Sequence, residues 1–190
     1  MLRAMHKQRI QLHPQPAFDL VRFLDFAGTS ADRIPEDEAF FREVWDRWQT
    51  QLEAHAIRTP QGRILFAWLA EAVETEIDTL WNSSPHTAYL LHVLALDLIM
   101  NAASQLVPQI AKHGCAPVPH PHPSIEHHAK ELGLHIEDGC ILSRRYAMLT
   151  PMPWNGGCAS CALAANCPRN TTEMQPSGMP STEFHSKHSS

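Results

Sequence analysis

Residues 63–81 have the sequence RILFAWLAEAVETEIDTLW, and this stretch decides how the fold of the chain is predicted. Its large apolar side chains recur every three or four positions, a spacing that places them on one face of an α-helix. The residues that keep this spacing are Ile64, Leu65, Trp68, Leu69, Val73, Ile77 and Leu80. The pattern therefore predicts one amphipathic helix from Arg63 to Trp81.

The segments on either side of this stretch also have helical patterns. Residues 36–56 carry Phe, Val, Trp and Leu at the same spacing and predict a second amphipathic helix. Residues 16–27 predict a short helix that a glycine ends. Residues 84–106 predict a long apolar helix, because they open with a Ser-Pro pair that suits a helix start and are followed by Pro108.

The second half of the chain changes character. Residues 115–123, CAPVPHPHP, alternate proline with other residues and predict an extended connector. A short helix is expected from Ser124 to a stop at Gly133. The Asp138-Gly139 step lies between short apolar stretches and predicts a β-hairpin.

The predicted fold class is therefore mainly α, with a helical domain of about four to five helices and a small C-terminal hairpin or loop module that contains cysteines. The expected organisation is a helical domain over residues 1–133, a cysteine metal-binding module over residues 134–169 and a disordered tail over residues 170–190. The tail is predicted to be disordered because it is polar and has almost no apolar side chains to bury.

The composition excludes some classes of partner. The chain has 190 residues, 44% of them apolar, and a formal net charge of −5, which is typical of a soluble globular protein. No dense basic run is present, so nucleic acid is not an expected partner. Residues 1–12 lack the apolar core of a signal peptide, and the apolar stretch 88–100 is short of the roughly 20 residues that span a bilayer. We therefore expect a cytoplasmic protein with no membrane span, in which cysteines stay reduced.

Three closely spaced cysteines carry the strongest chemical signal. Cys158, Cys161 and Cys167 form the pattern C-x2-C-x5-C-P, preceded by two glycines that let the loop wrap around a metal centre. In a reduced compartment such a cluster is more typical of metal binding than of disulfides. A cluster or a structural zinc ion usually takes four ligands, and Cys140 is the natural fourth, whereas Cys115 is expected to be an incidental thiol.

The identity of the metal stays open between iron–sulfur and zinc. Small apolar residues around the cysteines favour an iron–sulfur cluster, either 2Fe–2S or 4Fe–4S. A histidine as the fourth ligand would favour zinc. His120 and His122 alternate in the extended connector and can face one ion, whereas His127 and His128 are adjacent on a helix and are not expected to do so. Three reduced structural cysteines with no metal are the remaining alternative.

One segment, residues 138–163, resembles a known family. It contains Asp138-Gly139, the pair Arg144-Arg145, the step Met152-Pro153 and the Cys158-x-x-Cys161 motif. These elements resemble the C-terminal end of FhuF-type ferric-siderophore reductases. There, an Asp-Gly turn, an Arg-Arg pair, a Cys-Cys pair and an apolar-Pro step precede C-x-x-C. This chain has Tyr146-Ala147-Met148 where the family has its Cys-Cys pair.

The resemblance implies a function that the residues alone do not. In the family, four cysteines hold a 2Fe–2S cluster that passes an electron to siderophore-bound Fe(III), and the N-terminal region is mainly helical. The resemblance assigns Cys158 and Cys161 as ligands, and implies a ferric siderophore and an electron donor as partners. Arg144 and Arg145 are then candidates to attract an anionic chelate, or else they pair with Glu126, Glu131 or Glu137.

Two other functions explain the same cysteines. One is a zinc-binding accessory or interaction protein without catalysis, in which the helices form a partner surface. The other is a metal-delivery protein, in which the histidines and the tail pass an ion onward. The chain has no nucleophile elbow, P-loop or zinc-protease motif.

Overall fold

The computed structural model describes residues 9–29, 38–137 and 140–167. In these residues six α-helices accompany a four-stranded antiparallel sheet of order β1-β2-β3-β6. The strands are β1 (Arg9–Leu12), β2 (Leu52–Thr59), β3 (Gly62–Leu69), β4 (Ile136–Glu137), β5 (Ile141–Leu142) and β6 (Ala147–Pro151). The helices are α1 (Leu20–Ala27), α2 (Glu38–Gln49), α3 (Glu71–Trp81), α4 (Pro85–Leu106), α5 (Gln109–His113) and α6 (Pro123–Glu131), with 3-10 turns η3 (Gly157–Ser160) and η4 (Ala164–Asn166).

The fold is mixed α/β rather than mainly α, because the predicted helix over residues 63–81 is wrong in its first half. Residues 62–69 form strand β3, which pairs in antiparallel register with β2 through Leu52↔Leu69 and Thr59↔Gly62. The helix predicted over residues 36–56 likewise ends early, at Gln49, and the chain then enters strand β2 at Leu52. The run ILFAWL is apolar at every position, which suits a strand buried on both faces as well as it suits a helix.

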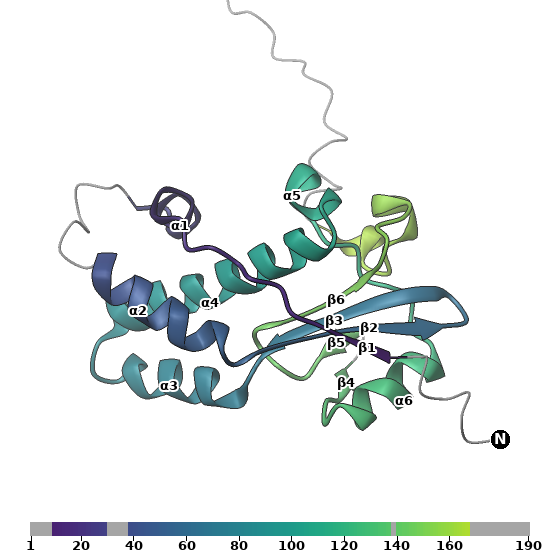
Figure 1. Cartoon of the computed structure of the whole chain (residues 1–190), viewed down its shortest axis with the longest axis horizontal. Coiled ribbons are helices and arrows are strands. Elements are labelled where there is room, and N and C mark those ends of the chain that lie inside the picture. Colours follow the sequence, from purple (N-terminus) through teal and green to yellow (C-terminus); the bar gives the residue numbers. More distant parts are fainter. Residues whose placement is uncertain (1–8, 30–37, 138–139, 168–190) are drawn as a thin grey trace, which may run out of the picture.

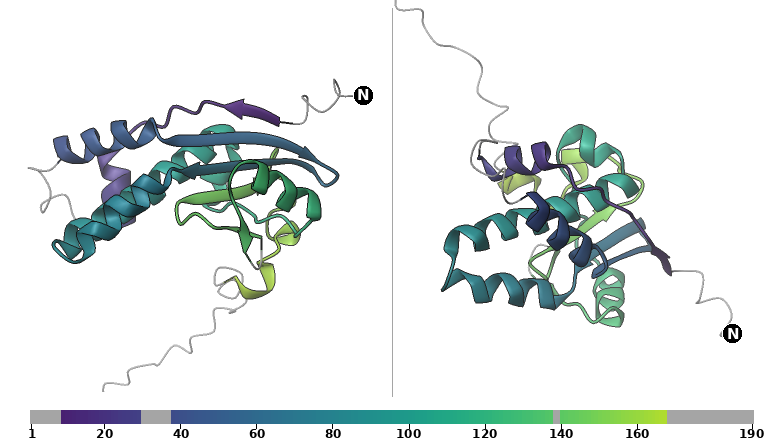
Figure 2. Two further views of the ribbon diagram at one scale, coloured as in Figure 1. Left: turned by 90° about the horizontal axis from the view of Figure 1, so that it is seen from below. Right: turned by 60° about the vertical axis from the view of Figure 1, so that its left-hand side comes forward.

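Strand β3 is covered on both faces. On one face Leu65 packs against Val107 at the end of α4 and Ile110 of α5. On the other face Phe66 packs against Ile125 of α6, in a cluster that also contains the β4–β5 hairpin. Figures 1 and 2 show this layering, with α4 and α5 on one side of the sheet and α6 on the other. Burying each large apolar side chain of β3 contributes roughly 1.5–3 kcal/mol, so the strand is a main source of stability.

Helix α4 is the long apolar helix that the sequence predicts. It begins after the N-cap Ser84 with Pro85 in its first turn, and it ends before Pro108 as expected. By length and composition it could cross a membrane, but 61% of its most apolar window is buried inside the protein, as in a core helix. Its Asp97 is buried and receives two hydrogen bonds from Arg22 of α1, at 2.8 and 3.0 Å.

Strand β6 joins the C-terminal part of the chain to the sheet. It pairs with β3 from Trp68↔Ala147 to Ile64↔Pro151, so part of residues 134–169 completes a sheet begun in residues 1–133. The hairpin predicted around Asp138-Gly139 is present as β4 and β5, which pair through Ile136↔Leu142, although the two turn residues themselves lie outside the described residues. The tail over residues 170–190 also lies outside them.

At the start of β6, Tyr146 is completely buried and its hydroxyl lies 3.0 Å from His92 Nδ1 on α4. Burial is the main cause that lowers the pKa of His92. The positive charge of the nearby Arg145 guanidinium lowers this pKa further. Burial also raises the pKa of Tyr146. The contact therefore ties β6 to α4 through a neutral imidazole and a neutral phenol.

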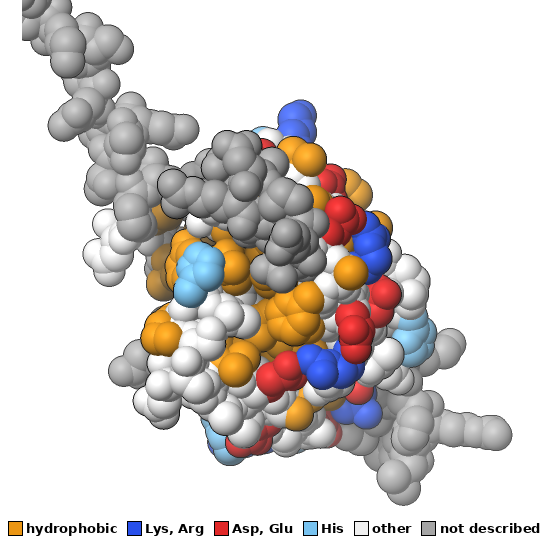
Figure 3. Space-filling view, turned by 90° about the vertical axis from the view of Figure 1, so that its left-hand side faces the viewer, with side chains coloured by type: hydrophobic (Ala, Val, Ile, Leu, Met, Phe, Trp, Pro, Cys, Tyr) orange, Lys and Arg blue, Asp and Glu red, His pale blue; other side chains and the backbone are white. Residues whose placement is uncertain are grey.

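Exposed apolar surface gathers at the helical end of the molecule, away from the 3-10 turns (Figures 1 and 3). There, α2, α3 and α4 enclose a cavity of 470 Å³ lined in part by Phe40, Leu80 and Leu91. The exposed large apolar side chains on helices α1 to α4 are Val21, Phe26, Phe40, Trp81 and Tyr89.

We predict that Arg22→Met lowers the free energy of unfolding by about 2–3 kcal/mol. The change leaves the Asp97 carboxylate buried without its cation, and the cost stays below the about 3–5 kcal/mol of a fully buried pair because Arg22 is 42% exposed. Urea unfolding measures the loss. Arg42→Met, which breaks an exposed pair with Glu38, is the matched control and should cost less than about 1 kcal/mol. Equal losses in the two variants would show that Asp97 does not depend on Arg22.

We also predict that stability falls as the pH drops below about 6.5, the ordinary pKa of a histidine. The folded-state pKa of His92 is depressed, so the unfolded chain binds more protons in the window below pH 6.5 and gains population there. His92→Gln should make the pH dependence of the unfolding midpoint shallower between pH 7 and about pH 5, and buried His55, whose pKa burial also lowers, accounts for part of what remains. The exposed His86→Gln is the control, and an equally steep fall in His92→Gln would contradict the assignment.

Candidate metal centre

The C-x2-C-x5-C segment forms a compact loop of two consecutive 3-10 turns. Turn η3 holds Cys158 and is closed by a hydrogen bond from the Cys161 amide to the Cys158 carbonyl at 3.2 Å. Cys158 is exposed, while Cys161 and Cys167 are half-buried. Cys167 follows turn η4 at the end of the described residues. The loop thus presents its first thiol to solvent and holds the second against the protein.

Trp154 fixes this loop on the body of the protein. Its ring stacks on His113 of α5, with centroids 4.5 Å apart and planes 6° apart. The other contact is with Gly157, where a Cβ would lie only 2.8 Å from the Trp154 ring and where φ is +53°. Only glycine satisfies both conditions at position 157, so Gly157 is required both by its backbone conformation and by its contact with Trp154. The Trp154 Nε1 is buried and has no hydrogen-bond partner among the described residues.

Cys161 is tied to the proline-rich connector. The amide of Val118 donates a hydrogen bond to Cys161 Sγ at 3.4 Å, and the Ala162 amide donates to the Val118 carbonyl at 2.9 Å. The connector also accepts a hydrogen bond at the Pro117 carbonyl from the Thr150 hydroxyl on β6. An N–H directed at a sulfur stabilises a thiolate and is one of the contacts that tune metal–thiolate centres.

Cys140 lies in a different environment. It is 2% exposed, packs in the apolar cluster beneath α6, and has a positive φ of 65° as the last residue of the β4–β5 connection. Burial, followed by the Glu126 charge, raises the pKa of its thiol and so favours the protonated form. This packing is what a small buried apolar residue would adopt, the alternative to the ligand role that spacing predicts for Cys140.

A cavity of 330 Å³ brings Cys140 together with Cys115. It lies along β6 and is lined on one side by Gly114, Cys115, Ala116 and Val118 and on the other by the β5 strand. The amide of the same Val118 contacts Cys161. Sequence spacing gave Cys115 no role, because a proline-rich connector separates it from the other cysteines. The connector instead runs beside β6, which no short-range pattern indicates.

The described cysteines do not converge on one point. No three of their sulfur atoms gather within ligand-sharing distance of one another in the described part of the chain, so the set Cys140, Cys158, Cys161 and Cys167 is not assembled as it stands. Cys158 and Cys161 are suited to be two ligands of one metal centre, because Cys158 is exposed and Cys161 Sγ accepts a hydrogen bond from a backbone amide.

The two arginines that were candidates to attract a chelate are paired with helix α3. Arg144 Nη2 donates to Glu71 at 2.8 Å. Arg145 makes two hydrogen bonds with Asp78, which lower the pKa of that carboxyl and raise the pKa of the guanidinium. The sequence predicted pairing as one alternative but named other partners, because the packing of α3 on this segment is a tertiary feature.

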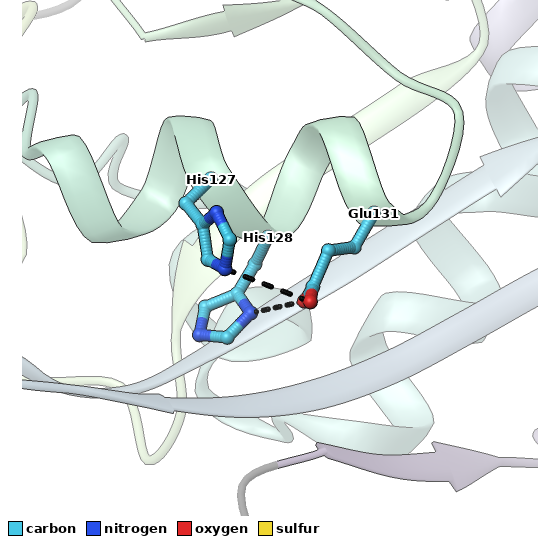
Figure 4. Close-up of side chains that lie close together, drawn as sticks. All are labelled: His127, His128 and Glu131. Atoms are coloured by element: carbon cyan, nitrogen blue, oxygen red, sulfur yellow. Dashed lines mark hydrogen bonds and ion pairs between the residues drawn. The ribbon is translucent and has the colours of Figure 1, made fainter. Parts of the chain in front are cut away.

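Within the part of the chain that the structure describes, the connector histidines belong to no group of three possible metal ligands. His122 Nδ1 accepts the Ser124 amide at 3.1 Å and caps α6, while His120 is exposed beside a separate cavity. The adjacent pair on α6 behaves differently from expectation. His127 and His128 both reach Glu131, through contacts of 3.6 and 2.9 Å (Figure 4). Sequence reasoning missed Glu131, although its i+4 and i+3 spacing from the two histidines is a usable signal.

Comparison of the chain with protein-family models, curated proteins and solved structures finds no match.

We predict that Gly157→Ala destabilises the cysteine loop more than Gly133→Ala destabilises the end of α6. Both glycines have positive φ, of 53° and 73°, so each alanine incurs a backbone cost of about 1–2 kcal/mol. Only at Gly157 does the new methyl group also meet a ring, that of Trp154. Urea unfolding and near-ultraviolet circular dichroism measure the difference. Equal effects would show that the Trp154 contact does not hold the loop.

Proposed function

We propose that this protein is an iron–sulfur redox protein whose cysteine loop supplies Cys158 and Cys161 as ligands. The observation that carries the proposal is the Val118 amide directed at Cys161 Sγ beside an exposed Cys158. A surface loop with two thiols two residues apart, one of them stabilised by an N–H, suits a centre that must exchange electrons with a partner. When bound, the cluster supplies one-electron chemistry.

A second observation, an unpaired hydrogen-bond donor, supports a metal centre near the loop. Buried N–H donors are almost always paired, yet Trp154 Nε1 has no partner among the described residues. Trp154 lies four residues before Cys158 and rests on Gly157 of the same loop. A sulfur-containing centre provides the acceptors that such a donor lacks.

The cavity on β6 supplies the remaining candidate ligands. Spacing predicts Cys140 and Cys167, but Cys140 shares the cavity with Cys115. The segment where FhuF-type reductases have their Cys-Cys pair corresponds to residues 146–148, and Ala147 and Met148 line this same cavity. We therefore propose that Cys115 and Cys140 take the place of that pair, with Cys167 outside the ligand set.

The narrower function is reduction of siderophore-bound ferric iron. Its support is the resemblance of residues 138–163 to FhuF-type ferric-siderophore reductases, which also implies an electron donor. The arginines add no support, because Arg144 and Arg145 are already paired with acidic residues of α3. The chelate would therefore be recognised by other groups near the exposed Cys158.

We predict that the full-length protein, purified without oxygen, absorbs visible light and contains iron. Cys158→Ser and Cys161→Ser should each abolish the colour, because a serine hydroxyl stays protonated at neutral pH and replaces a thiolate poorly. Cys115→Ala and Cys140→Ala should each bleach most of it. Cys167→Ala is the matched control and should keep the spectrum.

Three outcomes would contradict parts of this proposal. A colourless parent protein whose bound zinc is lost in Cys158→Ser and Cys161→Ser would overturn the redox function in favour of a zinc-binding accessory protein. A spectrum that survives both serine variants would overturn the ligand assignment. Bleaching in Cys167→Ala but not in Cys115→Ala would restore the ligand set that spacing alone predicts. Far-ultraviolet circular dichroism of each variant separates loss of the cluster from loss of the fold.

A further inference from the structure

Helix α6 carries a second group of metal-ligating side chains, separate from the cysteines. One ligand atom each from His127, His128 and Glu131 lies within 4.8 Å of the other two. Across residues 9–29, 38–137 and 140–167, no other three His, Cys, Asp or Glu side chains gather in this way. Figure 4 shows the three side chains projecting to the same side of the helix, with both imidazoles directed at the carboxylate.

The distances suit a tetrahedral ion. Zinc bonds to imidazole nitrogen and carboxylate oxygen are about 2.0–2.2 Å long, so two ligand atoms of a tetrahedral site lie about 3.3 Å apart. The two contacts fall on either side of that value, at 2.9 Å between His128 Nδ1 and Glu131 Oε2 and 3.6 Å between His127 Nε2 and Glu131 Oε1, and they use different carboxylate oxygens. One ligand atom from each of the three residues lies within 4.8 Å of the other two, so side-chain rotation would have to draw these atoms together around one ion.

Adjacent histidines on a helix are not expected to face one ion. Here both reach Glu131, because His127 lies four residues before it and His128 lies three residues before it. Their rings lie 5.4 Å apart with planes inclined at 54°, so the two rings approach the carboxylate from different directions. The His128 side chain is 11% exposed and held against the sheet, whereas those of His127 and Glu131 are 64% and 47% exposed. The group combines one fixed ligand with two that an ion can reach from solvent.

The electrostatics also favour a cation. The Glu131 carboxylate contacts both imidazoles, so a bound cation would meet one charged oxygen donor and two nitrogen donors. Binding would displace any proton held between imidazole and carboxylate, as at other histidine metal sites.

We propose that His127, His128 and Glu131 bind a divalent transition-metal ion, zinc first among them, independently of the cysteine centre. Two imidazoles and one carboxylate are a ligand set that zinc accepts and that magnesium and calcium, which require mainly oxygen, do not. Three protein ligands leave the fourth position to water or to another donor. That open position is the arrangement of zinc sites that activate water rather than of closed structural sites.

The test is a calorimetric titration of zinc chloride into the full-length chain carrying Cys158→Ser and Cys161→Ser, which removes the competing thiolate pair. In this background, His127→Ala and Glu131→Gln should each weaken zinc binding by about tenfold or more. Loss of a residue that only supports a metal ligand already costs about tenfold in affinity, and loss of a ligand should cost at least as much. Glu131→Gln keeps a hydrogen-bond acceptor for His128 and therefore preserves the local packing. His135→Ala, an exposed histidine just beyond the helix, is the matched control and should leave the affinity unchanged.

Two outcomes would overturn the site. One is zinc affinity in both ligand variants equal to that of the control. The other is no saturable zinc binding in the parent background at all. Neither result bears on the iron–sulfur proposal, since the cysteine variants are tested by colour and iron content.

Discussion

Burial of β3 on both faces is the constraint on which the rest of the structure depends. Because its apolar residues face two ways, the strand needs a cover on each side, and α4 with α5 and α6 with the β4–β5 hairpin provide these covers. Its two edges must also be paired, and β2 and β6 pair them. The second pairing brings residues far apart in the sequence to one place, since β6 carries the cysteine loop back over the end of α5.

The candidate thiolate centre follows from that pairing. Strand β6 lies at the edge of the sheet, and the proline-rich connector runs beside it instead of another strand. The connector brings Cys115 to the cavity that Cys140 lines, and its Val118 amide meets Cys161. The proline-interrupted connector is thus held beside the edge strand through the Thr150 hydroxyl, and it contacts both the cavity that Cys115 and Cys140 line and the loop that carries Cys161.

Local signals in the sequence predicted the features that depend on local chemistry. The start of α4 at Ser84-Pro85, the glycine stop after α1 and the hairpin around residues 138–139 are set by backbone preferences of a few residues. Strand β3 was not predicted because ILFAWL, at residues 64–69, fits a helix and a doubly buried strand equally well, and only its pairing partners decide. The cysteine motif was visible in the sequence, but the approach of Cys115 and the grouping of Glu131 with two histidines depend on tertiary packing and side-chain direction.

X-ray absorption at the iron and zinc edges of the oxygen-free, full-length protein shows which metal the cysteine loop holds. An iron–sulfur centre in the loop predicts iron with sulfur neighbours only and a short iron–iron scattering path, which is the signature of a cluster held by thiolates. Any zinc present should show nitrogen and oxygen neighbours, as the site on α6 requires. Zinc with sulfur neighbours and no iron would contradict the proposed redox function, because the cysteine loop would then hold a structural ion in place of a redox centre.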